Sequence, residues 1–204
     1  MKALSLSCLR RTAVVTLAVA LCAAPAEAHL NATGMGPLYD GVLHFLLSPE
    51  DLLPALALAL LAGLRGAAYG RRAALTLPAA WLVGSLCGLR AAATTGSAVV
   101  SSCGLLLLGG LLSADATLPL WAMTALAALL GLVHGYWNGT GMGQSGFAVI
   151  AVLGLTAAVC VLSMLAAAFV VQLRAHWARI AVRVAGSWIA ASGVLMLGWS
   201  LRGR

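Results

Sequence analysis

The stretch PEDLLPALALALLAGL, residues 49–64, decides the fold, because after two acidic residues it carries no charged side chain. A helix that crosses a bilayer needs about 20 mostly apolar residues. Five further apolar runs follow, at residues 73–93, 98–113, 118–136, 146–173 and 180–201. We therefore predict an all-α protein, a polytopic membrane helix bundle with about six transmembrane helices.

The composition of the whole chain is typical of a membrane protein. Of its 204 residues, 62% are apolar and 8% are charged, and the mean hydropathy is +1.03. The formal net charge of +7 comes from basic residues that stand in ones and twos between apolar runs, so no nucleic-acid-binding patch is expected. No P-loop sequence is present, which argues against direct use of ATP. The lipid bilayer is the expected partner.

The amino-terminal segment has the features of a secretory signal peptide. Residues 1–28 combine a basic start, an apolar run over 12–21 and the ending Ala26-Glu27-Ala28, which fits the small-x-small cleavage pattern. We predict that residues 1–28 are removed and that residues 29–204 form the membrane domain. The mature chain would begin at His29 on the extracytoplasmic side of a bacterial inner (cytoplasmic) membrane, as a multi-pass protein.

The positions of the arginines predict the same orientation. With the mature amino terminus outside, three arginines lie on the outer side and six on the cytoplasmic side, as the positive-inside rule requires. The pattern Asn-x-Thr-Gly-Met-Gly occurs at residues 31–36 and 138–143, and both copies would lie on the outer face as turns. The six cytoplasmic arginines are Arg65, Arg71, Arg72, Arg174, Arg179 and Arg183.

The densest group of polar residues is YDGVLHFLLSPED, residues 39–51. Ser48 and Pro49 read as the N-cap and first residue of a helix, and Glu50 and Asp51 follow at the positive end of its dipole. Asp51 also stands where it can form a pair like a capping box with Ser48. A capping role and a functional role for the two acids are compatible, and both stay open.

Three histidines are candidates for a site on the outer face. His44 lies in a short apolar stretch before the first helix, and His134 ends the fourth apolar run, four residues before Asn138. His29 would add a terminal amine beside its imidazole, which is a natural chelate for a late transition metal. Polar residues inside a membrane domain are costly to bury and are candidates for function by default.

Two other patterns have a structural explanation. Most tryptophans, Trp81 among them, lie near predicted span ends and are typical of an interfacial belt. The motif Gly84-x-x-x-Gly88 indicates close packing of helices.

The order of these pieces resembles the HupE/UreJ family of nickel and cobalt permeases. In that family a histidine after the signal peptide is followed by His-Pro-x-x-Gly-x-Asp-His at the first membrane helix and by His-Gly-x-x-His-Gly at the end of a middle helix. In this chain Glu50 stands at the family's aspartate, and Asp51 and Asn138 stand at the second histidine of each motif. The counterparts are His29, the segment from His44 to Leu52, His134-Gly-Tyr-Trp-Asn138-Gly139, Gly146-Phe147 and Arg183-Val-Ala-Gly186.

The resemblance implies a permease that accepts a divalent transition metal, nickel or cobalt, at an outward-facing site. The metal is the cargo, so no cofactor is expected, and the protein is not expected to be an enzyme. The implied ligands are His44, Glu50, Asp51 and His134, with Asn138 and His29 assisting.

Two alternatives stay open. The replaced histidines are compatible with a membrane accessory protein that transports nothing and is linked to a metalloenzyme maturation system. An intramembrane metal-dependent hydrolase would need about three His or Asp ligands and an activated water. Only two histidines lie near the membrane on the same side, which disfavours the hydrolase.

Overall fold

The computed structural model describes residues 34–92, 94, 96–143 and 146–202, and these contain helices and short connections without a strand. The prediction of an all-α bundle is confirmed. The predicted signal peptide and His29 lie outside the described residues. The described helices are α2 (Pro37–Leu47), α3 (Pro49–Arg65), α4 (Ala67–Gly88), α5 (Ala98–Ser113), α6 (Leu120–Met142), α7 (Ala148–Val171) and α8 (His176–Arg202).

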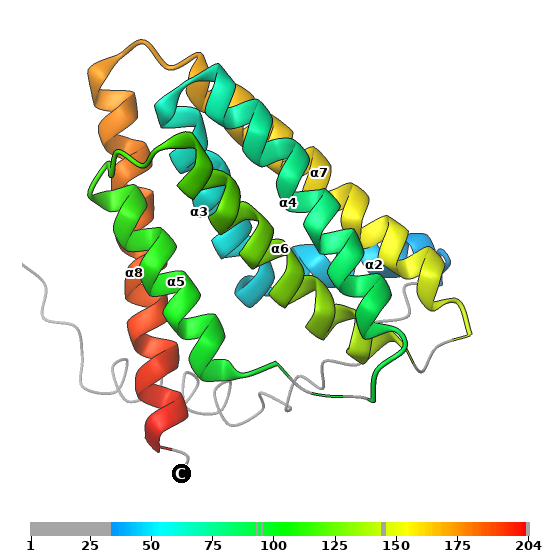
Figure 1. The fold of residues 1–204 in the computed structure, drawn as a ribbon. Coiled ribbons are helices and arrows are strands. Elements are labelled where there is room, and N and C mark those ends of the chain that lie inside the picture. Colours follow the sequence, from blue (N-terminus) through cyan, green and yellow to red (C-terminus); the bar gives the residue numbers. More distant parts are fainter. Residues whose placement is uncertain (1–33, 93, 95, 144–145, 203–204) are drawn as a thin grey trace, which may run out of the picture.

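Helix α3 lies at the centre of the bundle. Nearly every residue from Pro54 to Leu64 is buried, so α3 is enclosed on all sides, as its continuous apolar sequence predicts. Its neighbours include α4, α5 and α7, and Figure 1 shows α3 surrounded by the other helices. Alanines alternate with leucines in this stretch, and their small side chains allow the neighbouring helices to pack closely against α3.

Helices α2 and α3 are the two arms of a sharply bent segment. They meet at Ser48 at an angle of 74°. Pro49 has no N–H to continue the hydrogen bonds of α2, and it instead occupies the first turn of α3. Helix α2 packs along α7, where Gly41 lies against the backbone of Ala151. The bend therefore directs the first turn of α3 into the bundle.

A single residue, Gly66, separates α3 from α4. It has a φ of 108°, a conformation that glycine adopts without steric cost. The gap between the apolar runs 49–64 and 73–93 predicts a loop over residues 65–72, but a single glycine is enough to reverse the chain. Arg71 and Arg72 consequently belong to the first turns of α4 rather than to a loop.

Helices α4 and α6 run parallel and touch through glycines. Gly131, Gly135 and Gly139 recur at every turn along one face of α6, and Gly135 lies against the backbone of Trp81 in α4. Any side chain at these three positions would overlap with α4. The motif Gly84-x-x-x-Gly88 forms the opposing face of α4, which confirms that it serves close packing.

Helices α5 and α8 form an antiparallel pair that joins the bundle through α3 (Figure 1). Arginines stabilise the end of the bundle at which α3 and α5 terminate. The guanidinium of Arg179 donates a hydrogen bond of 3.1 Å to the carbonyl of Leu64, and Arg183 binds the end of α5 in the same way. Arg65 forms an ion pair with Asp115. Because Arg179 and Arg183 satisfy carbonyl groups that helix ends leave free, they contribute to the packing of this end of the bundle.

The helices α3 to α8 correspond one by one to the six predicted apolar runs, but the count of membrane spans is lower. Among the described residues, α6, α7 and α8 are each long and apolar enough to cross a membrane, and the bent pair α2 and α3 makes a fourth if it is one span. Helix α5 is apolar but has 16 residues. Helix α4 is long enough, but Arg71 and Arg72 lower its mean hydropathy.

The two copies of Asn-x-Thr-Gly-Met-Gly differ in the part that the structure describes in both, residues 34–36 and 141–143. Residues 138–142 are the last turn of α6, and Gly143 is its C-cap. In the first copy, Gly34 and Gly36 have positive φ values of 75° and 106° and precede α2. The interpretation of both copies as similar turns is therefore wrong, because α6 continues six residues beyond the predicted end of its apolar run.

Substitution Gly135→Ala tests the contact between α4 and α6. The added methyl group would overlap with the backbone of Trp81, so we expect a loss of about 1–3 kcal/mol in the free energy of unfolding. Gly141→Ala is the matched control, because Gly141 lies in the same helix with open space around it and alanine favours helix by up to about 1 kcal/mol. Thermal unfolding in detergent would distinguish the two. Equal midpoints would contradict the described packing.

Candidate functional site

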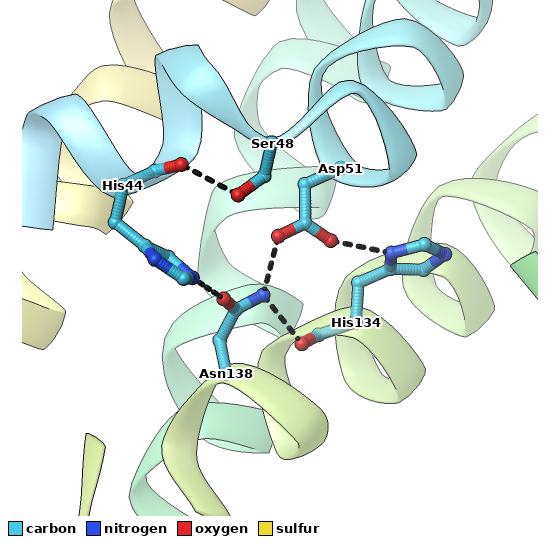
Figure 2. A network of polar contacts seen from close by, with 5 residues as sticks. All are labelled: His44, Ser48, Asp51, His134 and Asn138. Carbon is cyan, nitrogen blue, oxygen red and sulfur yellow. Dashed lines mark hydrogen bonds and ion pairs between the residues drawn. The ribbon is translucent and has the colours of Figure 1, made fainter. Parts of the chain in front are cut away.

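A buried carboxylate organises the main polar cluster of the protein. Asp51, in the first turn of α3, is 5% exposed. Its Oδ1 lies 2.7 Å from Nδ1 of His134, and its Oδ2 accepts a hydrogen bond of 2.8 Å from the amide of Asn138. Figure 2 shows Asp51 between these two side chains of α6. Because both oxygens have partners, the cost of burying the charge is offset.

The cluster extends from Asn138 to helix α2. Nε2 of His44 lies 2.7 Å from Oδ1 of Asn138, on the side of the amide opposite to Asp51 (Figure 2). The amide nitrogen of Asn138 also donates to the carbonyl of His134, one turn earlier in α6, at 2.9 Å. Asn138 thus links both arms of the bent segment to α6.

Ser48 forms the corner of the bent segment. It is the N-cap of α3, as predicted, but its side chain makes no capping hydrogen bond. Its hydroxyl donates instead to the carbonyl of His44 at 2.7 Å and so closes the end of α2. The predicted pair of Ser48 and Asp51 does not form, because the carboxylate of Asp51 is directed at α6.

Aromatic rings enclose the imidazole of His134. Trp81 is fully buried, and its ring centroid lies 5.7 Å from that of His134. The ring of Trp137 packs edge-on against His134, with the two ring centroids 5.5 Å apart. Phe45 of α2 packs edge-on against Trp81 at 5.8 Å. These rings hold the imidazole in one orientation and exclude bulk water, which strengthens its hydrogen bond to the carboxylate.

Two buried polar groups of α4 are left without a partner among the described residues. They are the indole N–H of Trp81 and the hydroxyl of Ser85, which lie one turn apart on the same face of the helix. An unsatisfied buried polar group costs about 1–3 kcal/mol. Both are therefore suited to bind a water molecule or a polar ligand beside the cluster.

The arrangement leaves one nitrogen on each histidine for other chemistry. When Nδ1 of His134 donates to Asp51, Nε2 carries a lone pair, which is the usual arrangement of a carboxylate that orients a metal-binding histidine. When Nε2 of His44 donates to Asn138, Nδ1 is the free acceptor. In the described part of the chain, no three His, Cys, Asp or Glu side chains are arranged to hold a metal ion. Binding an ion at this cluster would therefore require at least one of its hydrogen bonds to open.

Four of the six residues that the sequence suggested meet in this cluster. His44, Asp51, His134 and Asn138 form one hydrogen-bonded network. Glu50 does not join it: it is partly exposed and has no hydrogen bond or ion pair within the described ranges. The sixth residue, His29, lies outside these ranges.

Sequence reasoning missed the role of Trp81. It was assigned to an interfacial belt, but it lies inside α4 and contacts His134. The belt interpretation failed because Trp81 lies on the face of α4 that packs against α6, where it is fully buried instead of exposed to lipid. A tryptophan three residues before the packing motif at Gly84 was the available signal, since that motif already predicted a buried face.

Asp51→Ala and Glu50→Ala form a matched pair, because each removes one carboxylate from the first turn of α3. We expect Asp51→Ala to lower the free energy of unfolding by about 1–3 kcal/mol, since His134 and Asn138 lose their shared acceptor. Glu50→Ala should change it by no more than about 0.5 kcal/mol. The measurement is thermal unfolding of the purified proteins in detergent. If Glu50→Ala were the more damaging change, the network would not be the main stabilising feature of this turn.

A comparison with known protein families identifies the family of this chain. The model for HupE / UreJ protein matches residues 17–196, which is most of the chain. Searches of curated proteins and of solved structures found no match. The match includes both segments that supplied the network, the bent pair α2 and α3 and the end of α6. The chain belongs to the HupE / UreJ protein family.

Proposed function

We propose that this membrane protein transports a divalent transition metal, nickel or cobalt, and that the cluster at the bend between α2 and α3 is its binding site. The observation that carries the proposal is the network in which His44, Asp51, His134 and Asn138 meet from three helices. Membership of the family supports a role in metal handling.

The donor set fits this class of ion. Two imidazole nitrogens, a carboxylate and an amide oxygen are the borderline and hard donors that nickel and cobalt accept, and no thiolate is present in the cluster to favour a softer ion. The carboxylate of Asp51 would balance part of the charge of the ion in an apolar surrounding. Asn138 would exchange its hydrogen bonds for the ion through its carbonyl oxygen.

Weak binding suits a site that must release its cargo. An ion held by few protein ligands, with hydrogen bonds ready to re-form behind it, can leave more easily than one in a closed cage of three or four histidines. The bend at Ser48 provides a point at which α2 can shift relative to α3.

A second candidate is a membrane accessory protein that transports nothing and is linked to a metalloenzyme maturation system. The observation in its favour is that Asn138 bonds to His44, Asp51 and His134 at the same time, so the network is satisfied without an ion. Asn138 stands where the family motif has a histidine, and an amide is a weaker ligand for nickel than an imidazole.

Uptake into proteoliposomes tests transport directly. We expect one of Ni(II), Co(II), Cu and Zn to accumulate with the full chain, and His44→Ala and His134→Ala each to lower uptake at limiting metal by roughly 10- to 100-fold. His176→Ala is the control, because His176 is an exposed histidine at the start of α8, remote from the cluster. Absence of uptake of every metal by folded protein would contradict transport and favour the accessory role.

Substitution Asn138→His separates the two candidates. It adds an imidazole beside Asp51 and removes the amide that satisfies the network. If the cluster binds metal, we expect a higher affinity for Ni(II) or Co(II), measured by isothermal titration calorimetry in detergent, and a change in uptake rate. A variant that folds but binds neither ion would show that the cluster has only a structural role.

A further inference from the structure

Two grooves flank the amino-terminal half of α4 on the surface of the bundle. The first, of about 500 Å³, lies between α4 and α7, and the second, of about 790 Å³, lies between α4 and the start of α6. Arg71 and Leu75 line both grooves, so they form the ridge that separates them. The other walls are mainly apolar and include Ala74, Met164 and Ala168 in the first groove and Val83, Leu120 and Leu132 in the second.

The ridge carries positive charge that the protein does not neutralise. Arg71 and Arg72 are exposed, and neither has a hydrogen bond or ion pair within the described ranges. No acidic residue lines either groove. Among the other arginines at this end of the bundle, Arg65 pairs with Asp115 and Arg179 binds a helix end, whereas Arg174 is also exposed but lines neither groove.

The parallel packing of α4 and α6 places this ridge at the edge of the membrane. Leu77 lies beside Gly131, so the start of α4 is level with the start of α6. Trp121, at that start, is 75% exposed, and exposed tryptophans mark the boundary between hydrocarbon and head groups. Arg71 lies about one turn further in, within reach of the head groups for a long side chain that extends toward water.

We propose that an anionic phospholipid binds across the ridge, with its phosphate on Arg71 and Arg72 and its acyl chains in the two grooves on either side of Leu75. Arginine binds phosphate oxygens in a bidentate manner, and basic pockets between membrane helices select anionic head groups. The pair of apolar grooves matches a two-chain lipid rather than a free anion. This site is separate from the polar cluster and does not depend on metal transport.

The site can be tested by lipid retention. The full chain would be purified from vesicles that contain equal amounts of phosphatidylglycerol and phosphatidylcholine, and the retained lipids would be counted by mass spectrometry. We expect enrichment of phosphatidylglycerol on the unmodified protein, and roughly tenfold lower retention for the double substitution Arg71→Gln and Arg72→Gln. The double substitution Arg90→Gln and Arg202→Gln is the control. It removes the same charge from exposed Arg90, two residues after the end of α4, and from exposed Arg202, the last residue of α8, and this variant should retain the lipid.

A second variant tests the groove independently of charge. Ala168 is exposed in the wall of the first groove, so Ala168→Phe should fill it and lower retention of phosphatidylglycerol while leaving thermal stability in phosphatidylcholine unchanged. Inorganic phosphate at millimolar concentration should not displace the lipid.

Several results would overturn the proposal. Equal retention of the two lipids would show that the site is not selective for negative charge. Equal loss in the two double variants would show a general effect of net charge. Unchanged retention in Ala168→Phe, or displacement by inorganic phosphate alone, would show that the acyl chains do not occupy the grooves.

Discussion

The burial of the Asp51 carboxylate is the constraint on which the rest of the structure depends. A charge inside an apolar bundle is stable only when both oxygens have partners, and here the partners come from a helix more than 80 residues away. The carboxylate therefore sets the register of α3 against α6. The 74° bend at Ser48 makes this contact reachable, because it directs the start of α3 inward while α2 lies along α7.

Glycine packing and the polar network support each other. The glycines of α6 allow its backbone to touch α4 at Trp81, and the side chain of Trp81 then covers His134. His134 and Gly135 are adjacent in sequence, so the close approach and the buried hydrogen bond are positioned by the same turn of helix. In a membrane, where the surrounding lipid is as apolar as leucine, such packing and hydrogen bonding are the main forces between helices.

The two ends of the bundle have different chemistry. The polar cluster lies toward one end, where α2 and the last turns of α6 meet, and it contains the histidines and a carboxylate. The opposite end is rich in arginine, and some of these arginines cap helices while Arg71 and Arg72 stay available at the surface. This separation fits the two proposals, a cation site at one end of the bundle and a site for an anionic lipid at the other.

The sequence by itself determined the helical class, the six apolar segments and the family, because hydrophobic runs and motif order are local properties of the chain. It also indicated His44, Asp51, His134 and Asn138 as candidates, since polar residues are rare in such a chain. It left Asp51 and its neighbour Glu50 equivalent, and it placed Trp81 at the membrane surface. Only the tertiary structure showed that Asp51, and not Glu50, joins the cluster and that Trp81 is buried. The reason is that the bend at Ser48 and the glycine contact of α4 with α6 determine which side chains face one another across the bundle.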